Sequence, residues 1–440
     1  MTESTEIRAS RLSTRRQVSA EDTARRTRRR YRKEGILKSL GIGAIAIAIS
    51  LLGLLLWTVV AQGYSAFWQT YIKLEINYDA AIIAPNGDRD EAALRSASYA
   101  SLVNNALYEL FPNVEGRTNR RELRNLMSSG AALELRQRVL SDPDLIGTME
   151  TIWLLADDDV DQFLKGNISR DVEESQRRIS DLEITWIDTL EARGDIEFRF
   201  NTILFTNGDS REPELAGIWG AVVGSFYMMV VTFALSVPIG VASALYLEEF
   251  ASKSRLNDFI EVNINNLAAV PSIVFGLLGL AVFLNVFHLP RSAPIVGGLT
   301  LTLMTLPTIV VATRAALRAV PPSIREAALG VGASKVQTIF HHVLPLAIPG
   351  ILTGAIIGMA QALGETAPLL MIGMIAFIVD IPSSPWSPAT ALPVQVYLWS
   401  DSPERGFTER TAAAIMVLLM FLIAMNALAV FLRRRFERRW

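Results

Sequence analysis

Six apolar segments recur along the chain and predict membrane-spanning helices. The first, residues 40–61, is uncharged and has 22 residues, and a helix of about 20 residues crosses roughly 30 Å of hydrocarbon. A cleaved signal peptide is the alternative for this segment, but the run is longer than a usual signal and no small-residue cleavage site follows it. The other five segments are residues 215–247, 267–287, 293–312, 346–379 and 411–432.

A long polar stretch, residues 63–214, separates the first two apolar segments and predicts a separate domain. Apolar and polar residues alternate at the start of 71–78 and of 196–205, which indicates half-buried strands. Apolar residues three to four apart indicate helices in residues 91–110, 119–140 and 171–190. We therefore expect an α+β domain rich in helix.

An acidic run lies inside this polar stretch. Asp157, Asp158 and Asp159 are followed by Asp161, and this composition resembles a calcium loop. The run lacks the glycine and the terminal glutamate of an EF-hand. We therefore expect a solvated acidic turn and no metal site.

The charges are segregated in a way that predicts topology. Residues 1–38 hold twelve Lys/Arg and five Asp/Glu, whereas residues 63–214 hold sixteen and twenty-eight. The basic leader should stay in the cytoplasm, in contact with anionic lipid, and the first helix, residues 39–62, then places residues 63–214 outside. Strict alternation returns the basic stretches around Lys253, at 314–335 and at 433–440 to the cytoplasm. A nucleic-acid-binding arm is the alternative for the leader and is disfavoured beside a spanning helix.

Composition excludes most enzyme classes. Half of the residues are apolar, 20% are charged and the mean hydropathy is +0.30, whereas soluble domains are about 25% charged. There is no cysteine, and the three histidines, His288, His341 and His342, form no metal-binding pattern. Lys335 lies outside any P-loop pattern. We expect no catalytic residue, no metal site and no cofactor bound by this chain.

The stretch 321–345 carries the signals of two short helices joined by a turn. Ser323 and Glu326 have the spacing of a capping box, and Ser334 with Gln337 repeats it. Gly330 or Gly332 can adopt the left-handed conformation that ends the first helix. A loop built so rigidly between two spans suits the transmission of force to a partner.

This loop resembles the EAA loop of ABC importer permeases. The resemblance rests on Glu326-Ala327-Ala328, then Gly332, then Leu344-Pro345. In that family the loop inserts into a groove of a separate ATPase subunit, which uses ATP and magnesium, and couples its closure to the membrane helices. His342 stands where the family pattern has isoleucine.

Four further motifs resemble the A-type permease of the phosphate-specific (Pst) transporter. They are NNLAAVPSIVFG at 265–276, RAALRAVP at 314–321, GETAPLL at 364–370 and ALPVQ at 391–395. The resemblance covers residues 215–432 and implies the six-span type I importer fold. It also implies four kinds of partner: a second, related permease, two ATPase subunits, a periplasmic phosphate-binding protein and membrane lipid.

Glu365 is the one acidic residue inside the fifth apolar segment. Because an unpaired charge in hydrocarbon is costly, we expect Glu365 and its neighbour Thr366 to face the pathway or the bundle interior, with a basic partner for Glu365. Pro368 cannot donate its amide, which predicts a hinge at Gly364. A structural brace between helices is the alternative role for Glu365.

Three further polar residues are candidates for the pathway. Many Pst permeases have arginine where this chain has Gln361, which lies on the same helix face as Glu365. Arg314 and Arg318 are also four residues apart, and an exit role or plain contact with lipid headgroups would suit them equally.

These inferences predict an all-α polytopic permease of the bacterial inner membrane with both termini cytoplasmic and an α+β extracytoplasmic domain. Its expected activity is import of inorganic phosphate, driven by ATP hydrolysis on another chain. A permease for sulfate, molybdate or phosphonate is the alternative within the class. A membrane-bound sensor is the alternative outside it, but that reading leaves the EAA loop unexplained.

Overall fold

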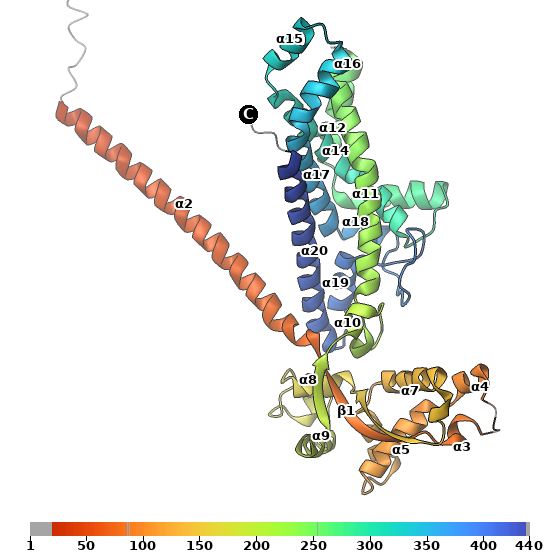
Figure 1. Ribbon diagram of the computed structural model, residues 1–440. Coiled ribbons are helices and arrows are strands. Elements are labelled where there is room, and N and C mark those ends of the chain that lie inside the picture. Colours follow the sequence, from red (N-terminus) through yellow and green to blue (C-terminus); the bar gives the residue numbers. More distant parts are fainter. Residues whose placement is uncertain (1–19, 86, 88, 253, 437–440) are drawn as a thin grey trace, which may run out of the picture. The chain divides into compact units, whose positions relative to one another are not determined.

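The computed structural model describes residues 20–85, 87, 89–252 and 254–436 (Figure 1). The chain divides into two compact units, residues 1–59 and 60–440. A single helix, α2 (Ala20–Gly63), accounts for the described part of the first unit and continues just into the second. This helix contains the expected first span at 39–62 and also the second half of the basic leader, residues 20–38. Residues 1–19 of the leader lie outside the described residues.

The apolar part of α2 has the length and composition of a membrane-spanning helix. Its leucine and isoleucine side chains, such as Leu40, Ile45 and Leu51, are more than half exposed. Side chains of this kind are stable only against lipid or another apolar surface. The helix is therefore built for an apolar environment along its whole central part.

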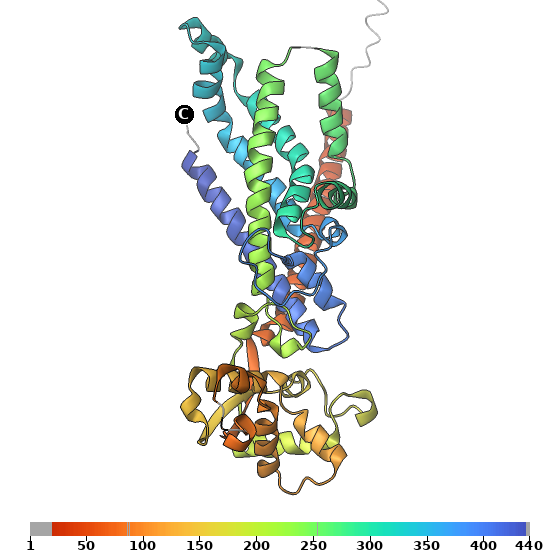
Figure 2. The same ribbon diagram turned by 90° about the vertical axis from the view of Figure 1, so that its right-hand side faces the viewer.

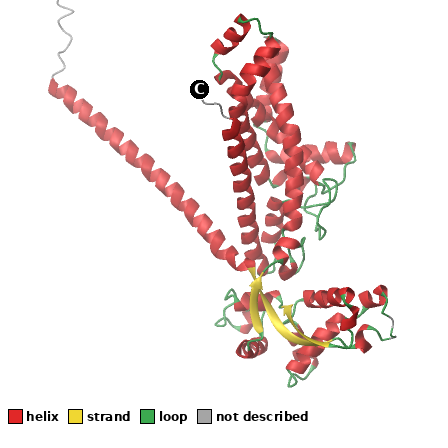
Figure 3. Cartoon of the chain, viewed as in Figure 1, coloured by secondary structure: helices red, strands yellow, loops and turns green. Residues whose placement is uncertain are grey.

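A three-stranded antiparallel sheet forms the centre of the polar stretch, which we call the inserted domain (residues 64–215). The strands are β1 (Trp68–Asn77), β2 (Met149–Leu155) and β3 (Ile196–Phe200), in the order β2-β1-β3. Ile72 of β1 lies opposite Leu154 of β2 and Ile196 of β3. In Figure 3 the strands occur only in this domain.

Helices pack on this sheet and enclose one apolar core. Fully buried members include Ile72, Tyr78, Leu107, Leu135 and Ile187. The helices that contribute to this core are α3 (Ala80–Ile83), α4 (Glu91–Ser96), α5 (Tyr99–Leu110), α6 (Arg117–Arg124), α7 (Ser129–Ser141), η2 (Pro143–Leu145), α8 (Asp158–Leu164) and α9 (Asp181–Arg193). The domain also contains η1 (Tyr64–Phe67), η3 (Glu174–Gln176), α10 (Ile203–Thr206) and η4 (Pro213–Leu215).

The expected elements of the domain differ from the observed ones in their bounds. The expected helices 91–110 and 119–140 are each divided into two, and the third occupies only 181–193. The expected strand 196–205 ends at Phe200, and β2 was not predicted from the sequence. The division after Ser96 places Ala97 in extended backbone, so local spacing of apolar residues did not reveal the break.

The acidic run is not the solvated turn that the sequence predicts. The carboxylate of Asp157 caps α8 by accepting a hydrogen bond from the amide of Asp159, 3.0 Å away. Asp158 and Asp161 are buried. Burial raises the pKa of Asp157 to about 8, and Glu214 adds to this rise. In the described residues no group of three or more histidine or acidic side chains has the geometry of a metal site.

Buried ion pairs join the inserted domain to the last long helix, α20 (Gly406–Phe436). Lys165 Nζ lies 2.6 Å from Asp161 Oδ2 and 2.7 Å from Glu409 Oε1, and these three side chains are at most 7% exposed. Asp161 also accepts from the amide and hydroxyl of Thr70 on β1, at 2.9 and 2.7 Å. Gln162 donates to Glu409 at 3.1 Å. We call Asp161, Lys165 and Glu409 the junction triad.

Among the residues that the structure describes, five helices are long and apolar enough to cross a membrane, or six if one strongly bent pair counts as a single span. Besides α2, they belong to α11 (Trp219–Leu245), α14 (Pro294–Ala319), the continuous stretch from α16 (Lys335–Gln337) to α17 (Leu344–Gly364), and α20. The described helices α11, α14 and α17 run side by side (Figure 2).

The expected third span, residues 267–287, is not one helix. Most of this segment is α13 (Ser272–Leu278) continued by the π-helix η6 (Gly279–Val286). The preceding helix, α12 (Arg255–Leu267), ends where the segment begins, and the bend between the two parts is 107°. Pro271 lies directly before α13 with an extended ψ of 137°. Since proline disfavours helical backbone in the residue before it, the chain turns there.

The expected fifth span, residues 346–379, is also interrupted. Helix α17 ends at Gly364, and after two residues a short helix, α18 (Ala367–Met371), begins with Pro368 near its start. Helix α19 (Leu392–Ser400), which lies between α18 and α20 in the sequence, packs against α20.

Candidate functional site

The loop at 321–345 is a helix, a turn and a second helix. Helix α15 (Pro322–Gly330) ends in a turn at Gly332, whose φ is 90°. The amide of Ala333 donates to the carbonyl of Ala328 at 3.1 Å, and the amide of Gly332 donates to that of Leu329 at 3.0 Å. These two bonds form a Schellman motif. The expectation of a left-handed glycine is therefore met at Gly332, whereas Gly330 remains inside the helix.

The second half of the loop begins with a capping box. The Ser334 hydroxyl accepts from the amide of Gln337 at 3.3 Å, and the Gln337 side chain accepts from the amide of Ser334 at 2.9 Å. From α16 the helix continues through the π-helix η7 (Thr338–Val343) into α17, which contains Leu344 and Pro345. One uninterrupted helix thus runs from the loop into a span.

The first expected capping box does not form. Helix α15 begins at Pro322 rather than Ser323, its N-cap is Pro321, and no side chain accepts a hydrogen bond there. Proline is favoured at the first helical position, because a backbone amide there has no hydrogen-bond partner within the helix and proline lacks that amide. Ser323 therefore lies inside the first turn, and Glu326 is exposed.

The tip of the loop exposes apolar side chains. Ala328 is buried and Ile324, one turn earlier, is half-buried, so this face of α15 packs on the helices. Glu326 and Ala327 face outward. Val331 is 86% exposed, and Leu329, Val336 and Phe340 are about half exposed. Several large apolar side chains exposed on one loop are typical of a contact surface for another protein.

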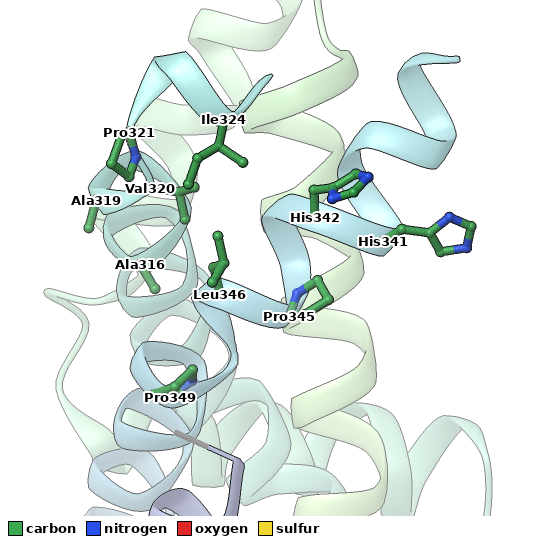
Figure 4. Close-up of a pocket in the computed structure, with 10 residues that line it drawn as sticks. All are labelled: Ala316, Ala319, Val320, Pro321, Ile324, His341, His342, Pro345, Leu346 and Pro349. Carbon is green, nitrogen blue, oxygen red and sulfur yellow. The ribbon is translucent and has the colours of Figure 1, made fainter. Parts of the chain in front are cut away.

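A cavity of about 670 Å³ lies on one side of α15 (Figure 4). It is bounded by the end of α14, the start of α15 and the stretch from η7 to α17. Its lining is mostly apolar, with His341 and His342 as its two histidines. The lining residues are Ala316, Ala319, Val320, Pro321, Ile324, His341, His342, Pro345, Leu346 and Pro349.

On the same end of the bundle, two arginines of α14 share one carboxylate. Helix α11 continues into the π-helix η5 (Tyr246–Phe250), which carries Glu248 and Glu249. Arg314 Nε lies 3.3 Å and Arg318 Nε 2.7 Å from the Glu248 carboxylate. Arg314 also lies 2.9 Å from Glu261 of α12. Both expected pathway arginines are therefore engaged in ion pairs that join α11, α12 and α14.

Glu249, the next residue, binds the loop itself. Its Oε1 accepts from Arg325 Nη2 at 2.6 Å and from Arg325 Nε at 3.2 Å. The Arg325 guanidinium also donates to the carbonyls of Val320 and Leu317, at 2.8 and 2.9 Å. Glu248, Glu249 and Arg325 were not among the residues predicted from the sequence. Two adjacent glutamates at the end of an apolar segment were the available signal.

The remaining expected pathway residues gather at the other end of α17. Glu365 is half-buried in the two-residue break after Gly364, Thr366 is the N-cap of α18, and Gln361 is exposed. In the part of the chain that the structure describes, the Glu365 carboxylate makes no ion pair. The expected basic partner is therefore not found there. A Cβ at Gly276 of α13 would lie 2.7 Å from Cα of Pro368, so the broken helices pack closely.

The expected pathway residues thus form two groups and not one. Arg314 and Arg318 lie at the end of α14 that precedes the loop, whereas Glu365 follows the far end of α17. Helix α17 has 21 residues, which is about 30 Å at 1.5 Å per residue. The expected hinge is a complete break between two helices and not a kink, because Pro368 has no amide to continue the hydrogen bonds of α17.

Two family descriptions match the chain. Residues 236–440 match "Binding-protein-dependent transport system inner membrane component". Residues 24–174 match "Domain of unknown function (DUF3333)", which covers much of the inserted domain and part of α2. The two matches therefore divide the chain near the start of the helical bundle.

Proteins from three bacteria are similar to this chain. The Bacillus subtilis "Probable ABC transporter permease protein YqgI" is 38% identical over 35% of this chain and 52% of that protein, so the chain spans about half of that relative. PstA 1 of Mycobacterium tuberculosis (strain CDC 1551 / Oshkosh) is 31% identical over 50% of this chain and 72% of that protein. Haemophilus influenzae PstA is 30% identical over 54% and 81%, respectively. The chain therefore belongs to the PstA family of phosphate transport system permease proteins.

Proposed function

We propose that this chain is the membrane subunit of an ABC importer that moves inorganic phosphate across the bacterial inner membrane. Membership of the PstA family supports phosphate as the substrate. ATP is hydrolysed by two partner subunits, a second permease of the same kind completes the pathway, and a periplasmic phosphate-binding protein delivers the ion. In this arrangement the chain adopts the six-span type I fold, with both termini cytoplasmic and the inserted domain outside.

The observation that carries the proposal is the loop at 321–345. Its exposed apolar side chains offer a surface to a partner, and its second helix continues without interruption into α17. A force on the loop would therefore reach a span directly. We assign the docking of the ATPase to residues 323–341, with Glu326 and Ala327 on the contact face.

The proposed pathway group is Gln361, Glu365 and Thr366. Gln361 is exposed in the single chain, and Glu365 lies where backbone leaves the helix. Irregular backbone at membrane depth is stable only when it is covered by protein or lines water. Gln361 can donate a hydrogen bond to an oxyanion, and a positive charge would then come from the second permease. Arg314 and Arg318 are assigned to bracing the helices, because both already have carboxylate partners.

The turn at Gly332 provides the test of the docking assignment. A Cβ added at Gly332 or at Gly330 would meet nothing within 4 Å, but only Gly332 has a positive φ. A β-branched residue at Gly332 is strained by backbone alone, whereas asparagine tolerates this conformation. We expect Gly332→Val to reduce phosphate uptake and substrate-stimulated ATPase activity several-fold, and Gly332→Asn to retain most of both.

The matched control is Gly330→Val, which makes the same change two residues away in ordinary helical backbone. All variants are measured as the complete complex in vesicles, with uptake divided by the amount of assembled complex. Sulfate and molybdate as competitors separate phosphate from related oxyanions. Normal uptake and ATPase activity in Gly332→Val would contradict the assignment.

A further inference from the structure

Helix α15 is held to the bundle through one charged side chain. The Arg325 guanidinium donates from two of its nitrogens to the Glu249 carboxylate. It also donates to two backbone carbonyls near the end of α14. Its side chain is 24% exposed and that of Glu249 is 10% exposed. One guanidinium therefore ties together three elements: α15, the end of α11 and the end of α14.

The carbonyl contacts have a clear electrostatic reason. The last carbonyls of a helix lack intrahelical partners and carry the negative end of the helix dipole, so a cation is stabilised there. Leu317 lies in the last turn of α14 and Val320 is its C-cap residue. The Leu317 carbonyl also accepts a hydrogen bond from the amide of Val320 at 3.3 Å. A planar guanidinium can serve the carboxylate and the two carbonyls at once, whereas a lysine ammonium offers three donors from a single nitrogen.

One side of α15 borders the cavity of about 670 Å³, and Ile324 of α15 forms part of its wall (Figure 4). Within α15, Ala328 is the single buried side chain. Because packing buries so little of this short helix, the ion pair and hydrogen bonds of Arg325 add a directional constraint on its orientation.

The two glutamates at the end of α11 form ion pairs with different helices. Glu248 joins α11 to α14 through Arg314 and Arg318, and Glu249 joins α11 to α15 through Arg325. Both lie in η5, a π-helical turn, and π-helical turns are frequent at functional sites. Arg325 thus links α15 to the end of α11 by one ion pair and to the end of α14 by two hydrogen bonds.

We propose that Arg325 is a positioning residue for energy coupling: it fixes the orientation of α15 on Glu249, so that movement of the docked ATPase becomes movement of α11. This inference rests on the proposed function, because it assumes that the ATPase docks on the loop. It adds the residue pair through which the loop acts on a second span, separate from the direct continuation into α17.

The test compares phosphate transported per ATP hydrolysed in the complete complex in vesicles. We expect Arg325→Ala and Glu249→Gln each to lower this ratio at least fivefold, with Arg325→Lys in between. The double variant should be no worse than Arg325→Ala alone, because both changes remove the same contact. The matched control is Arg170→Ala in the inserted domain, which removes an exposed arginine that also binds its carboxylate, Asp188, through two nitrogens.

Three outcomes would overturn the inference. A wild-type ratio in Arg325→Ala, with less assembled complex, would make Arg325 a structural brace only. A wild-type ratio in Arg325→Ala together with reduced uptake and ATPase activity in Gly332→Val would leave the docking assignment standing and remove only the role of Arg325. If Arg325→Ala keeps a wild-type ratio and Gly332→Val keeps wild-type uptake and ATPase activity, the proposed function of the loop itself fails as well.

Discussion

The junction triad predicts an unusually large effect from one substitution, Lys165→Met. Methionine keeps much of the length and apolar surface of lysine but removes the charge, which leaves the carboxylates of Asp161 and Glu409 without their shared cation. Removing one partner of a buried ion pair costs about 3–5 kcal/mol, because the remaining charge stays buried. Asp161 keeps its two bonds from Thr70, and Glu409 keeps the bond from Gln162. We therefore expect a cost near the lower limit, ~3 kcal/mol.

The assay is unfolding of the purified full-length complex by heat or urea, with Arg170→Met as the matched control. Arg170 and Asp188 also form an ion pair, but their side chains are 53% and 45% exposed. Exposed pairs contribute about 0–1 kcal/mol, so the control should be close to wild type.

A double-mutant cycle sharpens the test. Lys165→Met combined with Glu409→Gln should destabilise less than the sum of the two single changes, by about 1–3 kcal/mol, if the two side chains interact across the junction. Additive effects, or a Lys165→Met variant no less stable than Arg170→Met, would refute the reasoning. Either result would mean that the inserted domain is not held to α20 by these charges.

Two further predictions concern other carboxylates. Burial raises the pKa of Asp158 from 3.8 to about 7, so between these two pH values the folded protein binds more protons than the unfolded one. The free energy of unfolding should therefore fall as pH rises from about 4, and this loss should be complete above about pH 8. Asp158→Asn should flatten the pH dependence measured by thermal unfolding, whereas Asp188→Asn, whose carboxyl has a lowered pKa, should not. If the charge of Glu365 serves the pathway, Glu365→Gln should reduce phosphate uptake per assembled complex. If Glu365 is only a brace between helices, Glu365→Leu should mainly reduce the amount of assembled complex. Wild-type uptake in Glu365→Gln would exclude the pathway role.

The long helices were accessible from sequence because their signal is local. An apolar run such as 411–432 predicts α20 within a few residues at either end, since each backbone group in a span must be satisfied inside its own helix. The turn at Gly332 and the box at Ser334 were accessible for the same reason. Capping and left-handed turns depend on residues within one or two turns of the chain.

The breaks inside the third and fifth segments were not inferred, although Pro271 and Pro368 were visible. A proline in a span is tolerated when neighbours satisfy the freed carbonyl, so the residue alone does not decide between a kink and a break. Here the close approach of Gly276 to Pro368 joins the two broken segments. That contact links residues 92 positions apart by their numbers, and no local pattern records it.

The acidic run at Asp157 was misinterpreted for a related reason. Four carboxylates in five residues normally indicate a solvated turn. Asp161 is buried because Lys165 and Thr70 satisfy it, and Lys165 in turn binds Glu409, 244 residues later in the chain. Lys165 was visible in the sequence one helical turn after Asp161. Its pairing with Glu409 arises only in the folded chain, where α20 covers this surface.

Charged clusters at both ends of the helical bundle follow from the physics of packing in lipid. Apolar side chains gain little by leaving lipid for another apolar surface, so close packing and polar contacts must select one arrangement of helices. Small residues allow close approach: a Cβ at Gly240 of α11 would lie 2.7 Å from the side chain of Ile309 on α14, and Gly354 of α17 faces Ala312 of α14 in the same way. Such contacts tolerate sliding along the helix axes, whereas ion pairs do not. Glu248 with Arg314 and Arg318 therefore fixes the register between α11 and α14 at one end, and Glu409 with Lys165 fixes α20 against the inserted domain at the other. Exchanging either set of charges for apolar residues should preserve helices but lose their alignment.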